Sequence, residues 1–137
     1  MTNTEIVKGM YEAFNRGDIA GVLNSLADNV EWVVNGPNTI PFAGRFQGRD
    51  GVGGFFKKLA DSSESDPIRV EQYVEQGGVV VAIGTSTGRS KKLQKQVTTR
   101  FAMVFTLSGG KVTKFEEHLD TAAVASAYVS DTQAARS

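Results

Sequence analysis

The chain has 137 residues, 40% of them hydrophobic, and its fifteen basic and fifteen acidic residues cancel to a formal net charge of zero. This length suits one compact domain with a proper core, and the balanced charge excludes the basic footprint of a nucleic-acid-binding protein. The sequence has no cysteine, which excludes disulfides, a thiol nucleophile and a thiolate metal site.

Neither a targeting segment nor a membrane span is expected. Residues 1–14 lack the basic region and apolar run of a signal peptide. No apolar stretch approaches the length needed to cross a bilayer. We therefore expect a cytoplasmic protein that binds neither membrane nor nucleic acid.

Helical periodicity opens the chain. Thr2 and Glu5 have the spacing of a capping box, and Gly17 is a plausible end for the helix that follows. Its apolar face consists of Ile6, Val7, Met10, Ala13 and Phe14. Asp18 is a good N-cap for a second helix, and a first strand is predicted over 30–34. A third helix is predicted to begin at Arg49.

The segment 35–48 contains two prolines and three glycines, so we expect a loop without regular structure. It nevertheless carries Ile40, Phe42 and Phe46. Loops rich in large apolar residues usually fold back over something, often the mouth of a binding site.

The second half of the chain predicts four antiparallel strands. After a polar break over 61–67, residues 68–76 and 79–87 form a hairpin about two glycines, and 88–96 form a polar connection. Residues 97–120 form a longer hairpin, residues 121–129 a short helix, and 130–137 a disordered tail. This order predicts a single α+β domain, 1–137, in which a curved mixed or antiparallel sheet wraps around the N-terminal helices. Such a sheet makes a cone whose open end would admit a ligand.

The register of the 97–120 hairpin determines the predicted site. A two-residue Gly109-Gly110 loop pairs Ser108 with Lys111, so that Phe101 falls opposite His118. A three-residue loop would instead place Glu117 opposite Phe101, because a one-residue slip exchanges the two faces. The glycine pair favours the shorter loop. On that reading the polar side chains that lie among aromatic residues are Glu116, His118 and Asp120.

His118 and Asp120 point the same way on one strand, with Cα atoms about 6.5 Å apart. A neighbouring carboxylate and an apolar pocket together can bring either group near neutrality, where acid/base catalysis is efficient. We therefore predict Asp120 as the acid/base and His118 as an orienting or polarising group. The alternative is structural: Asp120 caps the helix that begins at Thr121, and His118 satisfies a buried polar group.

The remaining predicted substrate-binding residues share an apolar or amphipathic side chain near the same face: Trp32, Tyr11, Phe14, Phe42, Phe56, Phe101 and Met103, together with Glu116. For most of them core packing is the competing interpretation. Arg45 and Arg49 could meet an anionic substrate group or lie on the surface. One histidine without cysteine argues against a metal site.

Four local signatures resemble the SnoaL-like family of the nuclear transport factor 2-like superfamily, which has the ketosteroid isomerase fold. They are FNRGD (14–18), LADNVEW (26–32), PFAGRFQGRDGVGGFF (41–56) and EEHLD (116–120). The resemblance implies a cone-shaped α+β barrel. It also implies a homodimer paired through the outer sheet face, where Arg100, Ala102, Val104 and Thr106 are expected.

The chain departs from the ketosteroid isomerases where their chemistry resides. Val34 stands where those enzymes carry the base, and Met10 and Met103 stand where they carry the oxyanion-hole tyrosine and aspartate. Tyr11 is expected about 100° further round the helix than Met10. The resemblance is closer to SnoaL-type polyketide cyclases, whose acid/base carboxylate and histidine lie on the late strands.

The sequence thus predicts a small-molecule pocket protein without cofactor or metal. The first hypothesis is an acid/base enzyme of isomerase, cyclase or dehydratase type that acts on an apolar carbonyl or polyketide-like compound. The alternative is a non-catalytic module for hydrophobic-ligand binding or dimerisation.

Overall fold

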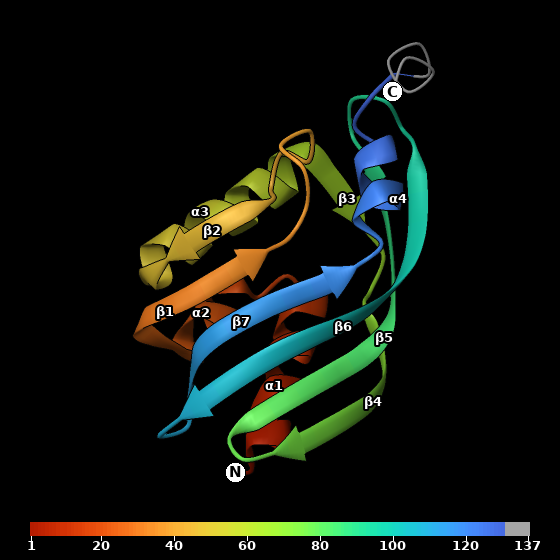
Figure 1. The fold of residues 1–137 in the computed structure, drawn as a ribbon. Coiled ribbons are helices and arrows are strands. Elements are labelled where there is room, and N and C mark those ends of the chain that lie inside the picture. Colours follow the sequence, from red (N-terminus) through yellow and green to blue (C-terminus); the bar gives the residue numbers. More distant parts are fainter. Residues whose placement is uncertain (131–137) are drawn as a thin grey trace.

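Seven strands form one strongly curved sheet in the computed structural model of the chain, which describes residues 1–130 (Figure 1). The strand order is β2-β1-β7-β6-β5-β3, with β4 also paired to β5. Only the β1–β7 pair is parallel within this part of the chain, so the sheet is mixed, which is one of the two alternatives that the sequence left open. The bounds are β1 (Leu26–Val34), β2 (Gly44–Gln47), β3 (Ser63–Ser65), β4 (Arg69–Gln76), β5 (Val79–Ser90), β6 (Gln96–Ser108) and β7 (Lys111–Leu119).

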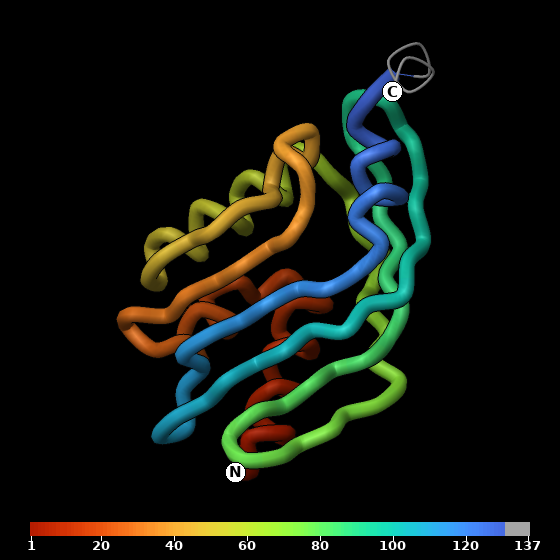
Figure 2. Tube along the Cα trace, in the orientation of Figure 1, coloured from red at the N-terminus to blue at the C-terminus, as the bar shows by residue number. Residues whose placement is uncertain are grey.

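The helices begin where the sequence predicts caps. α1 (Asn3–Asn15) has the capping box of Thr2 and Glu5, and Asp18 caps α2 (Ile19–Asn24) by accepting a hydrogen bond from the Gly21 backbone N–H at 2.9 Å. Both helices lie inside the curl of the sheet (Figure 2). α3 (Gly48–Ser62) packs beside β1 and β2. α4 (Thr121–Ser126) lies at the end of β6 and β7 that is away from their connecting turn. The predicted α+β cone with enclosed helices is therefore confirmed.

Three boundaries differ from the sequence prediction. β1 begins at Leu26 rather than at residue 30, and the predicted loop over 35–48 contains β2. The predicted polar break contains β3, which pairs with an extension of β5 to Ser90. β2 and β3 form because β1 and β5 satisfy the backbone groups of segments whose local sequence favours a loop, and at the start of β1 Leu26 pairs with Val112. The predicted tail lies outside the described residues, except for Ser130.

The helices and the concave face of the sheet share one core. Its largest fully buried side chains are Leu26, Val7, Val30, Val52, Val80, Val112 and Ser90. No helix within residues 1–130 is long and apolar enough to span a bilayer.

A β-bulge sets the register between β6 and β7. The hairpin begins as predicted, with Ser108 opposite Lys111, but Thr106 then pairs with Lys114. Thr113 is the extra residue, and its hydroxyl donates a hydrogen bond to the Thr106 carbonyl oxygen at 3.2 Å.

The bulge shifts every later pair by one residue. Glu117 therefore lies opposite Met103, His118 lies opposite Ala102, and Leu119 lies opposite Phe101. The prediction that His118 faces Phe101 and Met103 is wrong, because a one-residue shift exchanges the two faces of a strand.

Gly84 allows three strands to approach closely, and this yields a stability prediction. A Cβ atom at this position would collide with the Arg69 carbonyl oxygen and lie 2.9 Å from Phe101 Cζ. We expect Gly84→Ala to destabilise the protein by about 2 kcal/mol or more, since backbone and ring must move. In the control Gly54→Ala, within α3, the added methyl meets nothing within 4 Å and should stabilise by about 0.5–1 kcal/mol. Urea unfolding measures both changes, and equal effects would contradict the prediction.

Candidate functional site

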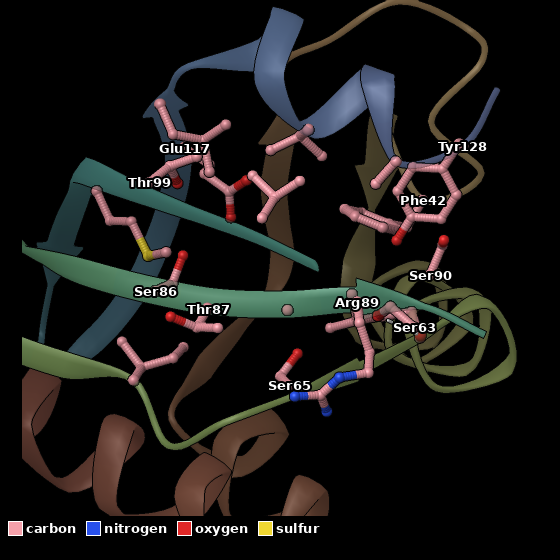
Figure 3. A pocket seen from close by; sticks show the side chains of 18 of the residues that line it. Phe42, Ser63, Ser65, Ser86, Thr87, Arg89, Ser90, Thr99, Glu117 and Tyr128 are labelled. Atoms are coloured by element: carbon pink, nitrogen blue, oxygen red, sulfur yellow. Dashed lines mark hydrogen bonds between the residues drawn. The ribbon is translucent and has the colours of Figure 1, made fainter. Parts of the chain in front are cut away.

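Two cavities meet inside the cone. The inner cavity, of about 80 Å³, is lined by α1, β1, α3 and the late strands: Met10, Tyr11, Phe14, Val22, Trp32, Phe55, Phe56, Leu59, Ile68, Met103, Phe105, Phe115 and Glu117. The outer cavity, of about 120 Å³, lies between α4 and the curved ends of β5 and β6 (Figure 3). Phe14, Leu59, Ile68, Met103 and Glu117 line both cavities, so these spaces adjoin.

Glu117 is the only ionisable carboxyl that lines either cavity within residues 1–130. Its neighbours of the same face on β7, Phe115 and Leu119, are apolar, and no described side chain donates a hydrogen bond to its carboxylate. Burial without a compensating partner raises the pKa of Glu117 from an ordinary 4.5 to about 7. Near neutral pH the group can therefore both release and accept a proton.

Tyr11 places a hydroxyl in the inner cavity that Glu117 also lines. The side chain is buried, and its hydroxyl donates to Met103 Sδ at 2.9 Å. Burial chiefly raises the pKa of Tyr11 well above its ordinary value, and the nearby Tyr73 and Glu117 add to the effect. Because thioether sulfur is a weak acceptor, the Tyr11 O–H remains a neutral donor that a better acceptor could claim.

Trp32 forms the wall of the inner cavity opposite α1. Its ring stacks on Phe115 with centroids 3.9 Å apart, and contacts Phe55 and Phe56 at 5.8 Å each. Its indole Nε1 is buried and has no acceptor within the described residues. Buried N–H groups normally have a partner, so this one is unusual.

Most of the predicted apolar site residues do line a cavity. Tyr11, Trp32 and Phe56 line the inner cavity, Phe42 lines the outer one, and Phe14 and Met103 line both. Phe101 is buried behind them and stacks on Tyr11 at 6.4 Å. Tyr11 enters the cavity alongside Met10, despite the angle between the two on the helix.

The predicted polar residues do not enter either cavity. His118 is exposed on the outer sheet face, 3.6 Å from Glu116, which also pairs with Lys114 at 3.4 Å. Asp120 is exposed and caps α4 by accepting a hydrogen bond from the Ala123 N–H at 3.0 Å. The capping alternative for Asp120 is thus the observed arrangement, and the bulge at Thr113 is the reason that Glu116 and His118 face outward.

Arg45 and Arg49 pair with groups outside the two cavities. Arg45 pairs with Glu31 at 3.0 Å, and Arg49 donates to the Leu26 carbonyl oxygen at 2.9 Å while pairing with Asp28 at 3.2 Å. Neither lines a cavity, which agrees with their surface interpretation. Within residues 1–130, no three His, Asp or Glu side chains are grouped to hold a metal ion.

Glu117 was considered only for the disfavoured register, although the sequence carries a signal for it. Without a bulge Phe115 would face solvent and Lys114 would face the core. Alternating Phe115 and Leu119 therefore indicate the true inward face, with Glu117 between them.

Comparison with known proteins places this geometry in a family. Residues 7–115 match the family model of the SnoaL-like domain. The chain is a SnoaL-like domain. An uncharacterised protein of Mycobacterium tuberculosis is 29% identical over 125 residues, which cover 89% of this chain and 92% of that protein.

Solved structures show the same architecture. A nuclear transport factor 2-like protein of unknown function from Burkholderia pseudomallei is 28% identical, with a TM-score of 0.85 over 95% of this chain and 100% of its own. TerC, co-crystallised with polyporic acid, is 27% identical, with a TM-score of 0.84 over 93% of this chain and 98% of its own.

In this SnoaL-like domain the carboxyl group that lines the cavities comes from β7, and β1 contributes none within the described residues. Val34, which stands at the isomerase base position, is apolar and only 2% exposed. Glu117 on β7 lies opposite Met103 on the neighbouring strand β6.

The raised pKa of Glu117 predicts a dependence of stability on pH. Between about pH 4.5 and 7 the unfolded chain loses this proton while the folded protein keeps it, so the unfolding free energy falls as pH rises through that window. The loss contributed by this group should reach about 3 kcal/mol at most. In Glu117→Gln that part of the slope should vanish, whereas Glu116→Gln on the outer face should retain it. Chemical denaturation at pH 5, 6, 7 and 8 gives the unfolding free energy of wild type and of both variants. An equal dependence of that free energy on pH in all three proteins would contradict a buried Glu117.

Proposed function

We propose that this SnoaL-like domain binds a small, mostly apolar carbonyl or polyketide-like compound and transfers a proton on it, with Glu117 as the acid/base. The observation that carries the proposal is the position of Glu117: an unpaired carboxyl where two largely apolar cavities meet. Perturbed carboxyls in clefts mark functional sites more often than structural ones. The co-crystallisation of TerC with polyporic acid supports a ligand-holding role for a cavity of this fold.

The proposed step is enolisation. Ionised Glu117 takes a proton from the carbon next to the substrate carbonyl. The electron pair of that C–H bond forms the C=C double bond of the enolate, and the π pair of the carbonyl group moves onto the carbonyl oxygen. Tyr11 donates its hydroxyl hydrogen bond to this oxygen as negative charge develops, giving up its weak Met103 acceptor. Return of the proton to another carbon would give isomerisation, and attack of the enolate on a second carbonyl would give cyclisation.

The experiment uses 1-tetralone, a bicyclic ketone, as the test ligand. Exchange of its protons next to the carbonyl for deuterium, followed by NMR in D₂O, reports proton transfer without knowledge of the natural substrate. We expect wild type to accelerate exchange, with a rate that rises with pH through about 7 as Glu117 ionises. Glu117→Gln should lower the enzymatic rate about a hundredfold or more, and Glu116→Gln should not.

Binding of the same ketone separates the catalytic from the non-catalytic reading. An apolar ligand removes water from Glu117 and so prefers its neutral form, which predicts weaker binding above pH 7 in wild type and no such trend in Glu117→Gln. Calorimetric titration measures this. Binding with this pH dependence but without accelerated exchange would favour the alternative of a ligand-binding module. Flat binding and no exchange would refute the role of Glu117.

We also propose that two copies associate through the outer sheet face. Val74, on β4, is 45% exposed. It pairs with the half-buried Val81 on β5, which in turn pairs with the half-buried Val104 on β6, so the three valines form an apolar row across the outer sheet face. Exposed apolar surface of this kind favours a symmetric partner. We expect sedimentation at micromolar concentration to give twice the 14.7 kDa chain mass, and Val104→Glu to shift it to the monomer. A monomeric wild type would contradict the proposal.

A further inference from the structure

The wall of the outer cavity carries more hydroxyl groups than its apolar inner neighbour, and they differ in whether they have partners. Ser63 donates to the Leu59 carbonyl oxygen at 2.9 Å, the Ser90 hydroxyl accepts from the Lys95 N–H at 3.4 Å, and the hydroxyls of Thr87 and Thr98 bond each other at 2.8 Å. These groups are used in holding the fold together.

Thr99 and Ser86 are different. They lie opposite each other on β6 and β5, both line the outer cavity, and neither hydroxyl has a hydrogen-bond partner within residues 1–130 (Figure 3). Thr99 is only 7% exposed. The Thr99 hydroxyl faces the cavity instead of a protein acceptor, and valine would fill the same volume at position 99 without a polar group in that wall.

We propose that the Thr99 and Ser86 hydroxyls form a second polar attachment point for the substrate, and that they select an apolar ring compound with an oxygen substituent far from the reacting carbonyl. This inference rests on the proposed function for the position of the reacting carbonyl, which Glu117 and Tyr11 hold in the inner cavity. The rest of the molecule would extend past Met103 into the outer cavity.

The placement of the two residues supports this division. Thr99 lies four residues before Met103 on β6, so its side chain is on the same face as Met103 but further toward α4. A serine and a threonine hydroxyl can each donate and accept, so the pair suits either a hydroxyl or a carbonyl oxygen. Arg89, also at this end, is already bonded to Gln96 at 3.2 Å and faces Glu64 and Asp66, which disfavours an anionic group there.

The first test needs no ligand. If the Thr99 hydroxyl serves a ligand, Thr99→Val should raise the midpoint of thermal unfolding by about 3 °C, because an unpaired polar group is removed. Thr106→Val, the same change on the outer face of β6, should alter it by about 1 °C or less. A lower midpoint for Thr99→Val would show that the hydroxyl has a structural role and would overturn the proposal.

The second test compares 1-tetralone with 6-hydroxy-1-tetralone by calorimetric titration. The added hydroxyl should increase affinity for wild type about fivefold, as expected for one hydrogen bond. The increase should disappear in Thr99→Val, diminish in Ser86→Ala and persist in Thr106→Val. Equal affinity of the two compounds for wild type, or an increase that survives Thr99→Val, would overturn the proposal.

The two proposals fail in different ways. If 1-tetralone binding depends on pH through Glu117 but the added hydroxyl does not increase affinity, the result supports the proposed function and contradicts the second attachment point. If the gain depends on Thr99 while exchange and pH dependence are absent, the attachment point stands and the catalytic role of Glu117 falls. Failure of both compounds to bind at millimolar concentration counts against both.

Discussion

The hydrogen bond from the Thr113 hydroxyl to the Thr106 carbonyl oxygen marks the place where β7 takes up one extra residue. Before this bulge Val112 faces the core; after it Phe115, Glu117 and Leu119 do. An unbulged strand would turn Phe115 to solvent and bring Lys114 inward, at a cost of several kcal/mol for an unpaired buried charge. The burial of two apolar residues therefore holds the register, and Glu117 enters the protein because it lies between them.

The position of Glu117 then determines the electrostatics of the interior. An ionised carboxylate without donors is unfavourable in an apolar cavity, so the neutral form persists to about pH 7. An apolar residue at the same place would avoid this cost. Tyr11 is also poorly hydrogen-bonded, because its hydroxyl donates only to the thioether sulfur of Met103. Both groups retain hydrogen-bonding capacity that the fold does not use.

The sequence predicts the elements well where the deciding interactions are local. The capping box at Thr2, the Asp18 cap and the Gly109-Gly110 turn were all readable, because each depends on residues within four positions of one another. β2 was not predicted, since its strand conformation depends on pairing with β1 across nine intervening residues that contain two prolines.

The site was only half predictable for the same reason. The apolar residues of the cavity lining could be predicted, because the periodic spacing of apolar residues is visible in the sequence itself. The identity of the ionisable group depended on a bulge, which local turn chemistry does not reveal; only the burial preference of Phe115 and Leu119 indicates it. As a result the prediction selected the outward face of β7 and Glu116, the neighbour of the residue that lines the cavities.

The distribution of polar groups without partners supports the proposal that the two cavities form one binding site. The carboxyl of Glu117, the indole N–H of Trp32 and the hydroxyls of Thr99 and Ser86 lack hydrogen-bond partners within the described residues, and all four residues line the cavities. On the outer face of β7, Glu116 lies between Lys114, at 3.4 Å, and His118, at 3.6 Å, and all three side chains reach solvent. A core selected for stability alone would distribute such defects or remove them. Their concentration around one connected space is what a ligand that supplies the missing acceptors and donors would explain, and the separation between Glu117 and the Thr99–Ser86 pair then sets how far apart the polar groups of that ligand must lie.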